Sequence, residues 1–205
     1  MNPAGPPGVR KRQARGERRI ASLLDAAAGV FAEVGYARAS TNAIAARAGA
    51  SPGTLYQFFP NKEAIADALA QRYIEQLRLA HTSAFPPELA TLPLTELLDR
   101  ILDPIIDFNL ANPGFRALLS DPGVPMNVAT SKQPLSEAMA DRLETLIAAR
   151  EPGLPVEDRR RCAQYAMTVF GSLLPLVLRA EGAERPAAIA EVKRVLSAYL
   201  SGYLS

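Results

Sequence analysis

The chain has 205 residues, 48% of them hydrophobic, which is enough for one large domain or two modest ones with packed cores. The single cysteine, Cys162, excludes an internal disulfide and a cysteine-based metal cluster, and the longest apolar runs, such as residues 169–178, are far shorter than the ~20 residues of a membrane span. The positive charge is concentrated at one end, because residues 1–20 hold six arginines and lysines against Glu17 alone, which gives +5 there and −3 in the remainder.

The N-terminal stretch is basic. Residues 1–9 are rich in proline and glycine, carry no periodic pattern and are expected to be disordered. The basic residues behind them indicate a polyanion partner, either nucleic acid or an anionic membrane, although a solubilising tail explains the charge equally well. Arg18 and Arg19 lead into an alanine-rich amphipathic pattern and not into the apolar run of a secretory signal, so we expect a cytoplasmic protein.

Four helices are predicted in the first third of the chain. Apolar residues recur at helical spacing over residues 18–34, and Gly35 stands where a C-cap belongs. A second, short helix is expected from a Thr41 cap to Gly49, and a third begins at Ser51 with a proline in its first position. A longer fourth helix, residues 61–81, is capped by an asparagine. The second and third helices therefore follow one another with only a tight turn between them.

The rest of the chain also shows helical periodicity. Residues 82–93 break the pattern, and at Pro104 either the next helix kinks or Asp103 caps a new one. The stretch 121–134 is a long loop of the kind that forms a lid or binding segment, or is disordered. No segment alternates like a strand, so the predicted fold is all-α. Further helices are expected at 94–111, 114–120, 135–150, 156–179 and 186–204.

The third helix has the composition of a DNA-reading helix. A helix enters the major groove only if its leading residues are small enough to let the backbone approach the phosphates and polar enough to read bases. Leu55 and Phe59 lie four residues apart and are expected to anchor this helix to the first one. The residues left for the DNA side are Pro52, Gly53, Thr54, Gln57 and Phe58.

Roles follow from side-chain chemistry. Gln57 is suited to a bidentate pair with adenine, and the Thr54 methyl to contact with a thymine methyl. A cation in the first turn of a helix opposes the macrodipole, so Lys62 is expected to meet a phosphate. For Tyr56, packing in a half-buried position is the alternative to a phosphate contact. The expected phosphate contacts are Thr41, Ser51, Tyr56 and Lys62.

The basic residues of the N-terminal stretch have two interpretations. As a flexible arm they would reach into the minor groove, or they would only raise non-specific affinity for DNA. We prefer the second interpretation. These residues are Arg10, Lys11, Arg12 and Arg15.

A set of spaced residues across this region resembles the TetR family of bacterial repressors, and the resemblance extends over roughly residues 17–77. It implies a one-component regulator that binds DNA as a dimer, with Asn42 at a position that often contacts a base. The remaining two thirds of the chain resembles the family only in being helical and of suitable length. The matching residues are Thr41, Ile44, Ala45, Ala48, Gly49, Ser51, Gly53, Thr54, Leu55, Tyr56, Phe59, Asn61, Lys62 and Glu63.

Three regions are expected. Residues 1–16 would be a disordered basic arm, and residues 17–63 a three-helix DNA-binding domain with its helix-turn-helix at about 40–59. Residues 64–205 are too many to serve only as support, so we expect a helical domain for effector binding and dimerisation. The hypothesis is a repressor released from a palindromic operator by a small molecule, without any other cofactor.

Two amphipathic stripes near the C-terminus suit a four-helix dimer interface, because a two-fold operator needs a two-fold protein. The alternative is that these faces are buried within one monomer. The predicted interface residues are Phe170, Leu173, Leu174, Val177, Val192, Leu196, Tyr199, Leu200 and Tyr203.

Candidate effector contacts are apolar residues of the second domain together with a few polar ones. The single histidine argues against a histidine metal site, and the absence of tryptophan favours an aliphatic or mixed ligand. The candidates are Leu77, His81, Phe108, Asn109, Phe115, Met126, Met139, Tyr165 and Thr168.

Three alternative functions differ in how far the sequence supports them. An enzyme has little support, because no serine, histidine and acid set or phosphate-binding glycine loop stands at a recognisable spacing. A membrane-surface protein lacks a basic amphipathic helix with large aromatic residues on its apolar face. A DNA-binding activator or architectural protein without an effector remains the open alternative.

Overall fold

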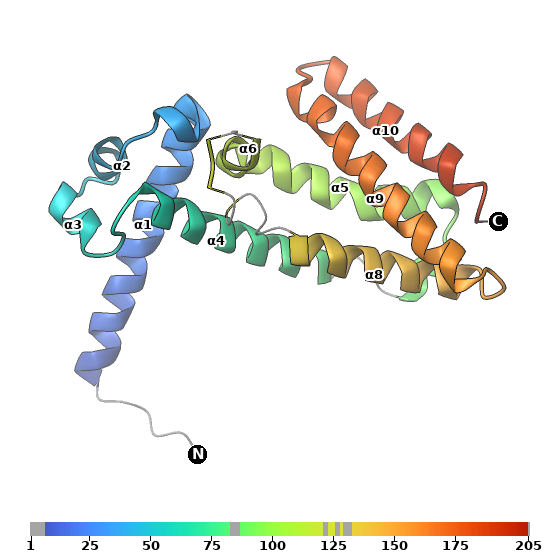
Figure 1. The fold of residues 1–205 in the computed structure, drawn as a ribbon, viewed down its shortest axis with the longest axis horizontal. Helices are drawn as coiled ribbons and strands as arrows, with labels where there is room; N and C mark the ends of the chain where they lie inside the picture. The colour runs from blue at the N-terminus through green and yellow to red at the C-terminus, as the bar shows by residue number, and fades with distance from the viewer. Residues whose placement is uncertain (1–6, 83–86, 121–122, 126–127, 129–132, 205) are drawn as a thin grey trace. The chain divides into compact units, whose positions relative to one another are not determined.

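A computed structural model describes residues 7–82, 87–120, 123–125, 128 and 133–204, and these residues form helices and turns without a strand (Figure 1). The predicted all-α fold is thereby confirmed. The elements are α1 (Pro7–Arg38), α2 (Thr41–Arg47), α3 (Pro52–Tyr56), α4 (Lys62–Thr82), the 3-10 helix η1 (Pro87–Thr91), α5 (Leu94–Ala111), α6 (Pro113–Ser120), α8 (Gln133–Arg150), α9 (Val156–Arg179) and α10 (Glu184–Leu200).

The chain divides into two compact units. The N-terminal unit holds residues 1–73 and 113–131, and the C-terminal unit holds residues 74–112 and 132–205. The division falls after Tyr73, inside α4, and not at residue 64 as expected, because the residues of α4 up to Tyr73 cluster with the N-terminal unit. It differs again because α6 joins the N-terminal unit, where it packs on α1.

The start of α1 differs from the prediction. Residues 7–16 belong to a helix that begins at Pro7, so only residues 1–6 of the expected disordered arm lie outside the described residues. A proline in the first helical position costs no hydrogen bond, since that N–H has no partner within the helix. Arg10, Lys11, Arg12 and Arg15 therefore lie on the first turns of α1.

Most predicted helix ends are confirmed. Gly35 and Gly49 adopt positive φ angles of 76° and 60°, a conformation that glycine reaches without a steric penalty. Ser51 Oγ accepts a hydrogen bond from the Thr54 N–H at 3.1 Å, and Asn61 Oδ1 accepts one from the Ala64 N–H at 2.8 Å. The cap of α2 is Ser40, whose Oγ accepts from the Ala43 N–H at 3.1 Å, and not Thr41 as expected.

The course of α5 decides between a helix that continues through Pro104 and a new helix that begins there. The helix runs without a break from Leu94 to Ala111 with Pro104 inside it, so Asp103 does not cap a new helix. Asp103 has another role, because its carboxylate pairs with Lys193 of α10 at 2.6 Å. Lys193 also pairs with Asp99, one turn earlier on α5, at 2.7 Å. These ion pairs tie α5 to α10 at the edge of the C-terminal core.

Each unit has its own apolar core. In the N-terminal unit Leu23, Phe31, Leu55 and Leu69 are completely or almost completely buried, and Phe115 of α6 lies against Tyr73 of α4 with ring centroids 4.9 Å apart. In the C-terminal unit α5, α8, α9 and α10 enclose a second cluster that includes Ile106, Ile147 and Val177. Burial of this apolar surface is the main force that holds each unit together.

Two helical segments are long and apolar enough to cross a membrane by length and composition, Gln13–Arg38 within α1 and Val156–Arg179, which is α9. Core helices of soluble proteins meet the same criteria. Both segments bury side chains in the core of their own unit, for example Phe31 in α1 and Phe170 in α9. They are therefore weak evidence for a membrane span.

The packing of α6 on α1 leaves no room for a side chain at Gly114. We expect Gly114→Ala to lower the free energy of unfolding by about 1–3 kcal/mol, the cost of overpacking, because a Cβ there would collide with the backbone of Ala28. Gly153→Ala is the control, since a Cβ at Gly153 meets nothing within 4 Å. Urea unfolding of the two variants measures the difference, and equal stabilities would contradict the close approach of α6 to α1.

Candidate nucleic-acid interface and ligand cavity

α2 and α3 form the predicted pair of short helices, and their inner faces are fixed by apolar packing. Leu55 is fully buried and Phe59 is 6% exposed, as their spacing predicts. α3 is shorter than expected: it ends at Tyr56, and Gln57 follows as its C-cap with helical backbone angles. Gln57 is nevertheless exposed, whereas Phe58 is half-buried in the turn that follows.

The leading end of α3 is open to solvent. Pro52 and Gly53 are exposed and Thr54 is half-buried. The Ser51 and Thr54 hydroxyl oxygens lie 2.9 Å apart, so Ser51 caps the helix and also holds the Thr54 side chain in place. An exposed helix start with small residues leaves room for close approach of another molecule.

The hydroxyl groups of Thr41 and Tyr56 meet on the outer surface of the pair. Their oxygens are 3.0 Å apart, which links the first residue of α2 to the last residue of α3. The Tyr56 side chain is 51% exposed, so the packing alternative for this residue has no support. Asn42, next to Thr41, is exposed as well. These three polar side chains remain available for contacts outside the chain.

Lys62 has partners within the chain that the sequence did not predict. Its Nζ donates to the backbone carbonyls of Tyr36, Ala37 and Ala39 at 2.9, 3.3 and 3.1 Å, and it lies 4.3 Å from the centroid of the Tyr36 ring. An ammonium group has three N–H donors, and these carbonyls accept from all of them. The cation thus has partners at the carbonyl-rich end of α1, and a phosphate contact at Lys62 stays a prediction.

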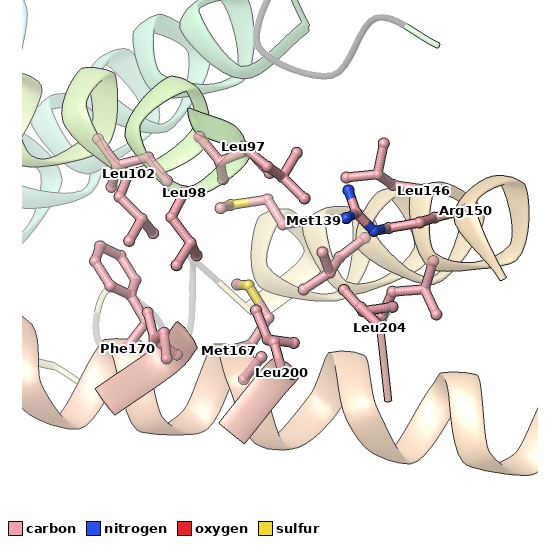
Figure 2. A pocket seen from close by; sticks show the side chains of 16 residues that line it. Leu97, Leu98, Leu102, Met139, Leu146, Arg150, Met167, Phe170, Leu200 and Leu204 are labelled. Carbon is pink, nitrogen blue, oxygen red and sulfur yellow. The ribbon is translucent and has the colours of Figure 1, made fainter. Parts of the chain in front are cut away.

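A cavity of about 40 Å³ lies within the C-terminal unit, between α5, α8, α9 and α10 (Figure 2). Its walls are leucine, isoleucine, methionine, alanine and phenylalanine side chains, and Arg150 at the end of α8 supplies the one charged group among the described lining residues. Of its lining residues the sequence indicated Met139 as an effector contact, but not those of α5, which follow the same spacing as an ordinary core stripe.

The expected effector residues are scattered. Of the nine, Met139 lines the cavity. Phe115 is a correction: it belongs to the N-terminal unit, where its ring lies against that of Tyr73 in a tilted arrangement. Tyr165 is 57% exposed, and the Asn109 and Thr168 side chains donate to carbonyls of their own helices, so these three do not face the cavity either. Leu77 and Phe108 are half-buried outside the lining, whereas Met126 and the His81 side chain lie outside the described residues.

The predicted dimer stripes are largely the interior of one chain. Five of the nine residues are buried in the C-terminal unit itself, so their assignment to an interface is corrected: Phe170, Val177, Val192, Leu196 and Leu200. Leu173, Leu174, Tyr199 and Tyr203 are half-buried. A different set of apolar side chains is exposed on α9 and α10, with 57% of Tyr165, 52% of Leu176 and 38% of Val195 accessible.

Cys162 has no reactive character. It is fully buried at the packing surface of α9, and this burial raises the pKa of its thiol to about 11. Burial also raises the pKa of Tyr199, with a further contribution from a hydrogen bond to Tyr203. Both groups are therefore neutral near pH 7, which fits their position beside an apolar core.

A stability measurement tests the role of Lys62. Lys62→Met should lower the free energy of unfolding by about 1–2 kcal/mol, because carbonyls at the end of α1 lose a charged donor. Arg19→Met serves as the control, since Arg19 is an exposed cation of the same unit, and it should change stability by less than about 0.5 kcal/mol. If the two variants are equally stable, Lys62 does not hold α4 to α1.

Two family models match the chain. One describes bacterial regulatory proteins of the tetR family and matches residues 23–69. The other describes the C-terminal domain of tetracyclin repressor-like proteins and matches residues 93–200, which is more than half of the chain. The first covers α2 and α3, and the second covers the cavity on α5, α8, α9 and α10.

Individual proteins are similar as well. The A-factor receptor protein of Streptomyces griseus is 39% identical over 88 residues, 43% of this chain and 29% of that protein. An uncharacterized HTH-type transcriptional regulator of Mycobacterium tuberculosis is 39% identical over 85 residues, 42% of each. The chain thus matches less than half of the length of these relatives.

Solved structures resemble the whole chain. A TetR-family transcriptional regulator from Streptomyces coelicolor is 32% identical with a TM-score of 0.59, over 91% of this chain and 99% of the other. A TetR-like regulator from Rhodococcus sp. RHA1 reaches a TM-score of 0.70 at 22% identity, over 90% of this chain and 96% of the other, which supports the fold alone.

Proposed function

The chain belongs to the tetR family of bacterial regulatory proteins, and from that membership we propose that it is a homodimeric repressor released from a palindromic operator by a small molecule. The observation that carries the proposal is the exposed outer face of α2 and α3 over a buried anchor at Leu55 and Phe59. Such a pair presents polar side chains in a fixed orientation, which sequence-specific reading of DNA requires.

We assign base reading to α3 and the residue after it. Gln57 is exposed and carries an amide that would pair with adenine, and the Thr54 methyl group would touch a thymine methyl. Pro52 and Gly53 let the helix backbone approach the DNA, and Phe58 borders this face. Asn42 on α2 is a further base contact in this proposal.

Phosphate contacts would then come from the surrounding hydroxyls and from α1. Thr41 and Tyr56 support each other through their hydrogen bond, and Ser51 lies at the start of α3. The basic first turns of α1, with Arg15 exposed, add non-specific attraction for the DNA backbone. Because this stretch is helical, we propose that its cations act from one helix and not as a flexible arm.

Dimerisation is proposed through the exposed apolar side chains of α9 and α10. Tyr165 and Leu176 are about three helical turns apart on α9, so they share one face, and Val195 adds to the apolar surface on α10. Exposed large apolar side chains on neighbouring helices are typical of an interface between subunits. Half-buried residues at the margins complete it in this proposal: Leu173, Tyr199 and Tyr203. Leu174 lies about two and a half turns from Tyr165, on the opposite face of α9, and packs against the core of the C-terminal unit.

Effector release would use α4. This helix starts directly after the DNA-reading turn, and its later residues Ile74 and Leu77 pack against the core cluster that also surrounds the cavity. A ligand in the cavity that favours another packing of this core would tilt α4. The tilt would change the distance between the two α3 helices of a dimer, which must be about 34 Å for successive major grooves.

The alternative is a DNA-binding activator or architectural protein without an effector. The cavity favours the ligand-responsive function, because a protein that only binds DNA needs no hollow in its second unit. Nothing in the family assignment supports an enzyme, and a DNA-binding regulator of this family is expected in the cytoplasm.

Selection of bound duplexes from a random pool tests sequence-specific binding, and we expect a single palindrome. Against that operator Gln57→Ala should lose about 1–3 kcal/mol of discrimination at one base pair, since the amide reads one adenine. Arg15→Gln is the matched comparison: it should weaken all sequences alike and reduce the slope of log K against log salt by about one. Recovery of no motif, or identical behaviour of the two variants, would contradict these roles.

The dimer surface is tested by sedimentation. Leu176→Glu should raise the dimer dissociation constant by roughly 30-fold or more, because it buries a charge in an apolar contact. Val156→Glu is the control: Val156 is 49% exposed on the same helix but lies about two and a half turns from Tyr165, on the opposite face. An unchanged dimer in Leu176→Glu, or equal loss in both variants, would exclude this face as the interface.

A further inference from the structure

The cavity between α5, α8, α9 and α10 has a wall on which the described residues expose no nitrogen or oxygen atom. In Figure 2 the side chains of Leu98, Met139 and Met167, which belong to α5, α8 and α9, point into the space between these helices. Phe170 adds an aromatic ring to the lining. Hydrocarbon and thioether groups thus form the surface that a bound molecule would touch.

Arg150 belongs to the lining but contributes no polar surface to it. Its Nη1 donates a hydrogen bond to the backbone carbonyl of Leu92, so the guanidinium is engaged by the protein itself. Long cationic side chains often cover apolar surface with their hydrocarbon stems while the charged group is directed elsewhere. A molecule in the cavity consequently meets no charged atom on the described wall.

Water is a poor occupant of such a space. About 40 Å³ is more than the ~10–15 Å³ that one water requires, but a buried water also needs about two to four polar partners, and the described wall offers none. Larger apolar cavities in other proteins, of about 150 Å³, stay dry and bind benzene or xenon. An apolar molecule would therefore enter without displacing ordered water, and it would gain dispersion contacts with the surrounding side chains.

The wall can widen without changing its chemistry. The cavity is smaller than the pocket of a typical ligand, so a bound molecule requires side chains to move. Met139 and Met167 are suited to this movement, because unbranched methionine side chains adapt to irregular spaces. Their thioether groups are apolar in every rotamer, so the widened cavity presents the same kind of surface as the present one.

We propose that this cavity binds a small uncharged hydrocarbon, held by shape and dispersion without a hydrogen bond or an ion pair. A hydroxyl group placed there would lose its hydrogen bonds to water without replacement, and an ionised group would lose far more. The inference rests on the proposed function, because occupancy of the cavity is then the signal that changes operator binding. It goes beyond that function in stating the polarity and the charge of the ligand.

NMR titration of the whole chain with ¹³C-methyl-labelled methionine tests the ligand class, because Met139 and Met167 place methyl groups at the cavity. Single substitutions of these two residues by leucine assign their signals. The probes share one ring: cyclohexane, cyclohexanol, cyclohexanecarboxylate and cyclohexylammonium, at about pH 7.5, where the acid and the amine are ionised. We expect cyclohexane to shift both signals and to bind about 10- to 100-fold more tightly than cyclohexanol. Neither ion should give a saturable shift.

Three results would overturn the proposal. Equal affinities for cyclohexanol and cyclohexane would reveal a polar group on the wall. Saturable binding of the carboxylate but not of the ammonium ion would show that the charge of Arg150 reaches the ligand. A titration in which cyclohexane shifts neither methyl signal would show that the cavity accepts no hydrocarbon.

Two substitutions at one position locate the site. Ala166 lines the cavity, so Ala166→Leu should fill it and weaken cyclohexane binding by at least about 10-fold. Ala187→Leu is the matched control, because Ala187 is an exposed residue of α10 outside the lining, and its variant should bind as the unmodified protein does. If Ala166→Leu does not unfold cooperatively, the smaller Ala166→Val replaces it and should weaken binding by about 5-fold. Unchanged binding in the folded Ala166 variant would place the ligand elsewhere and overturn the assignment.

Operator binding separates this inference from the proposed function. Cyclohexane that shifts the methyl signals without releasing the selected operator would confirm the ligand class and contradict effector release. A protein that binds a palindrome but no cyclohexane would keep the DNA-binding function and overturn the ligand inference. Release of the operator by cyclohexane in the unmodified protein and in Ala187→Leu, but not in Ala166→Leu, is the result that we expect.

Discussion

The contact between Lys62 and the end of α1 is the constraint on which the DNA-binding unit depends. The Lys62 ammonium group donates hydrogen bonds to the carbonyls of Tyr36, Ala37 and Ala39, at the point where Gly35 interrupts the helix. Tyr36 makes a second contact with α4, because its hydroxyl group lies 3.4 Å from the Glu63 carboxylate. The first turn of α4 is thereby fixed to the last turn of α1. Since α2 and α3 are the segment between these two anchored points, their orientation follows from this contact together with the burial of Leu55 and Phe59.

The sequence predicted the helices and caps of this unit because those signals are local. Gly49, Ser51 and Asn61 act through neighbouring backbone groups, and each stands in the structure where its chemistry places it. The partners of Lys62 within the chain were not predicted for the same reason. Judged against its own helix, the cation opposes the macrodipole and requires an external anion. The carbonyls that satisfy it are more than 20 residues away in the sequence, and no periodic pattern reveals a partner at that distance.

In the second unit, the periodicity of apolar residues predicts which helix faces are covered but not what covers them. A stripe such as Val192, Leu196 and Leu200 indicates that one face of α10 is covered, and the structure shows that its own chain covers it. Whether an apolar face meets its own chain or a second subunit depends on how the helices pack, and spacing along one helix does not contain that information. Of the lining residues the sequence analysis named Met139, but it did not identify those of α5, because their spacing is that of an ordinary core stripe.

The energetics of a ligand response follow from the small size of the cavity. A ligand shifts an equilibrium between two conformations only by the difference in its affinity for them. With about 40 Å³ available, a ligand of ordinary size would enter only if the helices around the cavity moved apart, so in the proposed mechanism it would bind a widened core more tightly than the present one. Ile74 and Leu77 of α4 pack against that core, and α4 continues to the anchored turn at Lys62. In the proposed mechanism, a ligand that requires a wider core would therefore act on α4, the helix that runs from one unit into the other, and would favour the DNA-free state.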